Sequence, residues 1–159
     1  MVKIYYSFIQ KNQKESFVKY VANLFGKCDN VPQEDNFCLG ENYFSVSFSG
    51  DIIMVAVANE KSIISLQKVV DIDYKQECLN FCTEKEISKM SNLQGYYILL
   101  TKKQSMAKHL GVKIKDVSFE DEIYSKGQRV EVNSISSLFD EYIFSIATTK
   151  QDYEKILIM

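Results

Sequence analysis

Gln104 and Lys108 are the first candidates for chemistry in this sequence, because they lie where an apolar run becomes a basic segment (YYILLTKKQSMAKHLG, residues 96–111). The two residues are four apart, so in a helix their side chains share a face. From that face Lys108 can reach a phosphate oxygen, and Gln104 can orient a ligand or a metal-bound water. The alternative is an ordinary exposed helix face, in which Thr101 and Gln104 form a capping box after the apolar run.

The second candidate is the acidic pair Asp71 and Asp73 in the stretch VVDIDY, residues 69–74. We expect this stretch to be a strand, in which residues two apart point to the same side and lie roughly 7 Å apart along the chain. Carboxylates so placed repel each other unless a cation or solvent lies between them, and Mg²⁺ takes carboxylate, water and phosphate oxygens. The alternative is a solvated strand edge, where charged side chains discourage aggregation.

Length, composition and charge limit the classes of protein to which the chain can belong. Its 159 residues are enough for one compact domain or for two small lobes that share a core. Hydrophobic residues make up 46% and charged residues 25%, which is typical of a soluble globular protein. The net charge of -2 and the lack of a long apolar run predict neither nucleic acid nor a membrane as a partner. The N-terminus has no signal-peptide pattern, so we expect a cytoplasmic protein.

The cysteines do not have the spacing of a typical zinc site. They are Cys28, Cys38, Cys78 and Cys82. Only the last two are close in sequence, and the single histidine, His109, lies inside another motif. We therefore expect four reduced thiols that lie partly in the core.

Hydrophobic periodicity indicates an α+β protein with mostly antiparallel strands. The first part of the chain is expected to hold a strand at 2–9, an amphipathic helix within 11–27 with Gly26 at its end, a loop at 27–42, and strands at 43–49 and 51–58. The remainder is expected to hold a run at 62–74 that ends as a strand, a short helix capped by Thr83 and Glu86, a longer helix ended by Gly111, a hairpin at 121–132, a strand at 141–148, and a further strand or docked tail at 153–159.

The order and spacing of four segments resemble those of the 4'-phosphopantetheinyl transferases of the surfactin-synthetase type. That family carries an (F)-N-[IV]-S-H-S-G-[DR] hairpin, then G-[IV]-D-[IV]-E, then F-[FS]-x-x-E, and then [FW]-[ST]-x-K-E-[SA]-x-x-K. The matching segments are FSVSFSGD (44–51), VVDIDY (69–74), NFCTEKEISKM (80–90) and LTKKQSMAKHLG (100–111). The resemblance extends from Phe44 to Thr148, about two-thirds of the chain.

The resemblance implies an α+β fold of two small pseudo-symmetric lobes, each with antiparallel strands and a helix, and a cleft between them. A shortened first lobe would span 1–60, and a second lobe with the metal and coenzyme motifs would span 61–159. The implied activity is transfer of the phosphopantetheine arm of coenzyme A to a serine of an acyl or peptidyl carrier protein. Mg²⁺ would bridge acidic side chains and the diphosphate of coenzyme A.

The same resemblance assigns roles to individual residues. The expected metal ligands are Asp71, Asp73 and Gln104. The expected catalytic residues are Gln104 and Lys108. The residues expected to bind the coenzyme are Ser47, Phe48, Ser49, Lys103 and Lys108.

The sequence also departs from the family pattern at positions where the chemistry needs a particular group. Gln104 replaces a glutamate, and an amide cannot accept a proton near neutral pH. Phe48 replaces a histidine, Val69 replaces a glycine, and residues 10–42 contain no match to the basic residues that bind the 3'-phosphate in the family. The alternative function is therefore a catalytically impaired relative that binds or scaffolds a carrier protein. A third hypothesis is a homodimer, in which a second copy completes the short first lobe.

Overall fold

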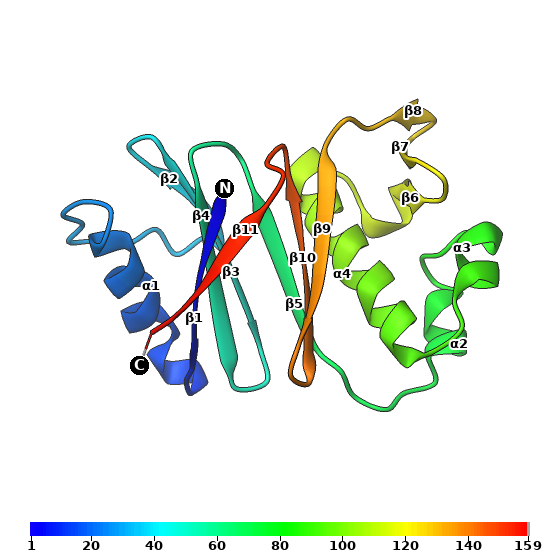
Figure 1. Ribbon diagram of the computed structural model, residues 1–159, viewed down its shortest axis with the longest axis horizontal. Helices are drawn as coiled ribbons and strands as arrows, with labels where there is room; N and C mark the ends of the chain where they lie inside the picture. The colour runs from blue at the N-terminus through cyan, green and yellow to red at the C-terminus, as the bar shows by residue number, and fades with distance from the viewer. Residues whose placement is uncertain (159) are drawn as a thin grey trace.

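The protein folds into two larger sheets, a small third sheet and a set of helices, and the computed structural model describes residues 1–158 (Figure 1). The first sheet has five strands in the order β11-β1-β4-β3-β2. These are β1 (Val2–Phe8), β2 (Asn36–Leu39), β3 (Asn42–Ser49), β4 (Ile52–Ala58) and β11 (Tyr153–Leu157). A short 3-10 turn, η1 (Lys11–Gln13), leads into α1 (Lys14–Asn23), which packs on one face of this sheet.

The second sheet has three strands in the order β5-β10-β9 and is covered by the longest helix (Figure 1). Its strands are β5 (Ile63–Lys68), β9 (Asn133–Phe139) and β10 (Tyr142–Thr148), and the helix is α4 (Leu93–Leu110). Two short helices precede α4, namely α2 (Tyr74–Cys78) and α3 (Glu84–Lys89). It is followed by η2 (Ile114–Asp116) and by the small sheet of β6 (Val117–Phe119), β7 (Ile123–Ser125) and β8 (Gln128–Arg129).

The two larger sheets repeat one order of elements: a strand, a helix, and a hairpin whose second strand pairs with the first strand. These elements are β1, α1 and β3–β4 in the first sheet, and β5, α4 and β9–β10 in the second. The hairpin turns begin with Gly50 and Asp140, which both have positive φ, at 60° and 54°. The predicted α+β class with mostly antiparallel strands is confirmed.

The serine side chains of β3 connect the two larger sheets. Because side chains in a strand point to opposite faces in turn, its serines face β5 while Phe44 and Val46 pack toward α1. Each serine hydroxyl accepts a hydrogen bond from a backbone N–H of β5. The pairs are Ser45 with Ile64 (3.0 Å), Ser47 with Leu66 (3.0 Å) and Ser49 with Lys68 (2.9 Å).

One hydrophobic core lies between the two larger sheets. It combines side chains of β1 and β4 with side chains of β5 and β10, among them Ile4, Met54, Leu66 and Phe144, all at most 1% exposed. Full burial of such a side chain contributes about 1.5–3 kcal/mol. The relative position of the two larger sheets is therefore set by this shared core as well as by the serine contacts.

The strand expected at the end of 62–74 is wrong, because the strand in this segment, β5, lies at its start. β5 ends at Lys68, which is also the last residue in register with β10. One further backbone bond, from Val69 N–H to the carbonyl of Glu141 at 2.7 Å, closes the ladder. Residues 69–73 then form an irregular segment, so the same-side geometry predicted for the two aspartates is wrong as well.

The ends of the helices follow local signals in part. Thr83 and Glu86 form the predicted capping box, and Gly111 ends α4 with a positive φ of 71°. The start of α4 differs, because Asn92 caps it and Thr101 lies in its middle, where no capping box can form. Instead the Thr101 hydroxyl donates to the carbonyl of Tyr97 at 2.9 Å.

The end of the chain returns to the first sheet, where β11 pairs in parallel with β1. The expected boundary at residue 60 separates β1–β4 of the first sheet from the strands of the second sheet. After β10, however, the chain returns to the first sheet with β11. The four cysteines are free thiols, as predicted. Within residues 1–158, no helix has the length and apolar character needed to cross a membrane.

Candidate functional site

A cleft of about 700 Å³ lies where the two lobes meet, between β3, β5 and the C-terminal half of α4. Ser47 and Phe48 of β3 line one side, and Gln104 and Lys108 of α4 line the other. Four residues that the sequence singled out are thus brought together from elements that are distant in the chain. The contacts of the β3 serines with β5 fix the position of β3 relative to β5.

The side chain of Gln104 is held against β5 by two hydrogen bonds. Its Oε1 accepts from the Ser65 hydroxyl at 2.6 Å and from Nε2 of Gln67 at 3.3 Å. Ser65 and Gln67 are two apart on β5, so both point toward α4. The meeting point of strand and helix is therefore lined by three polar side chains without charge.

Positive charge surrounds this neutral group. Lys108 comes from the end of α4, and three more lysines line the cleft, namely Lys11, Lys14 and Lys113. Of the lining residues that the structure describes, only Asp35 is acidic, and its carboxylate is paired with Lys14 at 2.9 Å. Four lysines against one aspartate make this cleft a site that attracts anions.

Sequence reasoning missed Lys11 and Lys14. Both lie in the segment 10–42, which has no sequence match to the family's basic residues. Their local context is that of ordinary exposed lysines at the start of an amphipathic helix. Only the packing of η1 and α1 beside β3 brings them to the same cleft as Lys108. These two lysines are therefore identified only by their positions in the folded protein, because the local sequence does not distinguish them from other exposed lysines.

Asp71 and Asp73 lie outside the cleft and are exposed. Asp73 is the N-cap of α2 and accepts the backbone N–H of Gln76 at 3.3 Å. The neighbouring Val70 is held by the hydroxyl of Tyr97, at 3.4 Å from its nitrogen. Gln104 is seven residues farther along α4, which is about 10 Å along the helix axis.

The expected magnesium ligands therefore do not converge. The two aspartates belong to the segment that leaves β5, while the Gln104 oxygen already accepts two hydrogen bonds. Within residues 1–158, no group of three His, Cys, Asp or Glu side chains is placed to hold a metal ion. The residues at the cleft do not fit the magnesium site that the resemblance implies.

Lys103 points away from the cleft into the contact between α4, α3 and β6. Its side chain is fully buried and forms an ion pair with Glu86, which is equally buried, at 2.8 Å. The ammonium also donates to the carbonyl oxygens of Phe81 at 2.8 Å and Val117 at 2.6 Å. The place of Lys103 in the structure is in the core, and Ser49, likewise expected to bind the coenzyme, bonds β5 beyond the edge of the cleft.

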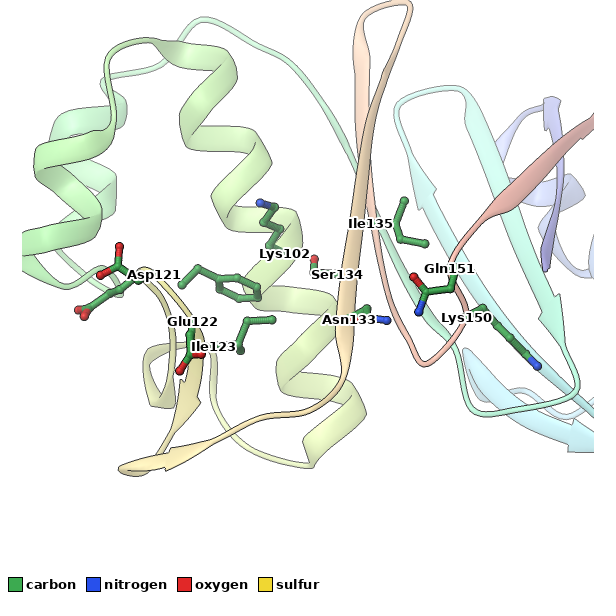
Figure 2. Close-up of a pocket in the computed structure, with 11 residues that line it drawn as sticks. Lys102, Asp121, Glu122, Ile123, Asn133, Ser134, Ile135, Lys150 and Gln151 are labelled. Atoms are coloured by element: carbon green, nitrogen blue, oxygen red, sulfur yellow. The ribbon is translucent and has the colours of Figure 1, made fainter.

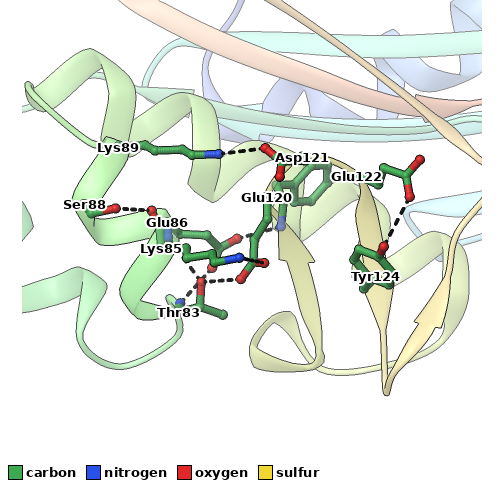
Figure 3. A network of polar contacts seen from close by, with 10 residues as sticks. Thr83, Lys85, Glu86, Ser88, Lys89, Glu120, Asp121, Glu122 and Tyr124 are labelled. Carbon is green, nitrogen blue, oxygen red and sulfur yellow. Dashed lines mark hydrogen bonds and ion pairs between the residues drawn. The ribbon is translucent and has the colours of Figure 1, made fainter.

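A second cavity, of about 420 Å³, lies between α4, β9 and the turn that joins β6 to β7 (Figure 2). Burial lowers the pKa of Lys102, whose ammonium lies 5.8 Å from the centre of the Phe119 ring. The acidic residues of this cavity are already paired, two of them as drawn in Figure 3. The pairs are Glu120 with Lys85 (3.7 Å), Asp121 with Lys89 (3.4 Å) and Glu122 with Arg129 (3.3 Å). Because opposite charges offset each other there, the cleft between the lobes is the better candidate site.

No protein-family model matches this sequence, and a search of curated proteins found no match either. The chemistry of the cleft is therefore read from its own residues. Its lysines can bind phosphate oxygens, the ring of Phe48 offers an apolar surface, and the amides of Gln67 and Gln104 can form hydrogen bonds. This combination suits an organic ligand that carries phosphate groups.

Proposed function

We propose that the chain is a phosphopantetheinyl-transferase-like protein that binds a ligand of the coenzyme A class in the cleft between its lobes without transferring the phosphopantetheine arm. Its role would then be that of a subunit that binds or scaffolds an acyl or peptidyl carrier protein. The observation that carries the proposal is the composition of the cleft: four lysines, one paired aspartate, and the uncharged polar side chains of Ser65, Gln67 and Gln104.

The contacts of Gln104 support a different alignment with the family motifs. In the family that the sequence resembles, the glutamate on the helix serves as a third metal ligand beside the acidic pair or as a base toward the carrier serine, so we expect the pair to lie beside the helix residue. The residues that lie beside Gln104 are Ser65 and Gln67, two apart on β5. Under this proposal the segment IISLQ (63–67), rather than VVDIDY (69–74), would take the place of G-[IV]-D-[IV]-E, with Ser65 and Gln67 at its two acidic positions and Gln104 at the position of the helix glutamate.

Transfer chemistry requires groups that this centre lacks. Phosphoryl transfer depends on neutralising developing charge and on a group that accepts the proton of the attacking hydroxyl. The hydroxyl of Ser65 and the amides of Gln67 and Gln104 do not accept a proton near neutral pH. Mg²⁺-dependent transfer to a carrier serine is the alternative function, and it would need a carboxylate or base from outside this group.

Calorimetric titration of coenzyme A tests the binding part of the proposal. We expect micromolar affinity for the unaltered protein and a loss of about tenfold, or about 1.4 kcal/mol, in Lys108→Ala. Lys115→Ala is the matched control, since Lys115 is exposed and lies outside the cleft. Absence of binding in the unaltered protein, or an equal loss in both variants, would refute the proposed site.

A transfer assay tests the second part. Labelled coenzyme A, a panel of acyl and peptidyl carrier proteins and Mg²⁺ are incubated with the protein, and the carriers are weighed by mass spectrometry. We expect carriers without the added phosphopantetheine mass. A modified carrier would overturn the non-catalytic reading and establish transfer in its place.

A further inference from the structure

The orientation of the Gln104 amide determines what the centre of the cleft offers to a ligand. Its oxygen is occupied by the hydroxyl of Ser65 and the amide nitrogen of Gln67. Its Nε2 carries two N–H donors, for which no acceptor is found among residues 1–158. The residue is half-buried and lines the cleft, so these donors are available to a ligand that binds there.

The charges around this amide are unsuited to a divalent cation. Gln104, Ser65 and Gln67 bring no negative charge, and Lys108, about one turn farther along the same helix, brings a positive charge to the cleft. A cation at this point would lie in a positive field without a carboxylate ligand, which Mg²⁺ usually requires in proteins. An anionic oxygen at the same point would meet N–H donors and lysine ammonium groups, which bind oxyanions directly.

We infer that the Gln104 amide takes the place of a metal ion in this cleft, donating hydrogen bonds directly to phosphate oxygens, so that the ligand binds in its metal-free form. This inference rests on the proposed function, because it concerns the same cleft and a ligand of the same class. It specifies the ligand as the free polyanion and identifies Gln104 as the residue that selects it. Mg²⁺ then competes with the protein for the phosphate oxygens of the ligand.

The isosteric change Gln104→Glu tests this inference by reversing the dependence on metal. Glutamate keeps an oxygen that accepts from Ser65 and Gln67, so the hydrogen bonds within the protein are retained. It removes both N–H donors and adds a negative charge facing the ligand. Gln94→Glu is the matched control, because Gln94 is exposed near the start of the same helix and lies outside the cleft.

The experiment is a calorimetric titration of coenzyme A in EDTA and in millimolar Mg²⁺. For the unaltered protein and Gln94→Glu we expect binding in EDTA that Mg²⁺ leaves unchanged or weakens. For Gln104→Glu we expect a loss of at least about tenfold in EDTA that Mg²⁺ reverses in part. Thermal unfolding of each variant establishes that the proteins compared are folded.

The possible failures are distinguishable. Binding by the unaltered protein that requires Mg²⁺ would overturn the inference and leave the proposed function standing. Equal binding of Gln104→Glu and the unaltered protein in EDTA would do the same, because the donors would then have no role. Absence of binding under both conditions would overturn the proposed function and this inference together. If Gln104→Glu does not fold, a requirement of the unaltered protein for Mg²⁺ would still overturn the inference.

Discussion

The hydroxyl of Ser65 donates a 2.6 Å hydrogen bond to the side-chain oxygen of Gln104, across 39 positions of the chain. This contact ties β5 to α4 at the centre of the cleft. It leaves the amide nitrogen of Gln104 without an acceptor among residues 1–158, in a cleft that four lysines also line. We therefore expect the uncharged side chains of Ser65 and Gln104 to favour a phosphate-bearing ligand over a metal ion in this cleft.

Binding of coenzyme A is expected to weaken with ionic strength, because lysines of both lobes attract the ligand. Between about 0.01 M and 1 M salt the Debye length shortens from about 30 Å to about 3 Å, so exposed charges are screened. Lys11→Gln is expected to bind several-fold more weakly and to show a smaller dependence on salt. Lys19→Gln is the control, because Lys19 is exposed on α1 outside the cleft. Identical salt dependence in both variants would remove Lys11 from the site.

The serine contacts between the lobes are expected to stabilise the fold. Ser45 is fully buried, accepts the backbone N–H of Ile64 at 3.0 Å, and donates to Oδ1 of Asn36 at 2.6 Å. Ser45→Ala leaves both partners without a hydrogen bond, which costs about 1–3 kcal/mol in the free energy of unfolding. Urea denaturation measures this cost. Ser16→Ala, at an exposed position of α1, should stay within about 0.5 kcal/mol, and a similar value for both changes would contradict the role of the serines.

The buried ion pair between Lys103 and Glu86 is expected to be essential for stability. Lys103→Met leaves the carboxylate of Glu86 buried without its partner, which typically costs about 3–5 kcal/mol. Lys89→Met breaks an exposed pair with Asp121 and should cost at most about 1 kcal/mol. Urea midpoints of the two variants give the comparison. Equal midpoints would show that Glu86 is neutralised or solvated in some other way.

His109 is expected to make the fold less stable in acid. Burial and the nearby charge of Lys61 lower the pKa of its imidazole below the ordinary value of 6.5. Since the unfolded chain then binds the proton more readily, the free energy of unfolding falls as the pH drops through the window below about 6.5. His109 is the only histidine, so His109→Asn should flatten the difference in urea midpoint between pH 7.5 and pH 5.5. An unchanged difference would assign the pH dependence to carboxylates instead.

Several features were predictable because they depend on neighbours along the chain. The hairpin around Gly50, the capping box of Thr83 and Glu86, and the helix end at Gly111 all follow from local backbone chemistry. Gln104 and Lys108 also share the predicted face of one helix and line the same cleft. Spacing along a helix is sufficient for that prediction, because the helix itself fixes the geometry.

The position of the strand within 62–74 was not predictable in this way. The segment SIISLQKVVDIDY holds β-branched residues in both halves, and only the low strand propensity of Asp71 and Asp73 disfavours its second half. Pairing with β10 ends at Lys68, opposite Tyr142, so the partner strand decides where the strand stops. As a result Ser65, rather than Asp71, faces Gln104, and the chemistry expected of the site changes with the register.

The sequence by itself determined the class of fold, the helices α1, α3 and α4, and the helix face that carries Gln104, but it predicted neither α2 nor β2, which lies in the expected loop 27–42. Tertiary structure alone decided that η1 and α1 bring Lys11 and Lys14 to the same cleft, and that β11 returns to pair with β1. The physical reason is range. Caps and periodicity act over a few residues, whereas the charge of a cleft and the partners of a strand depend on packing between segments that the chain separates widely.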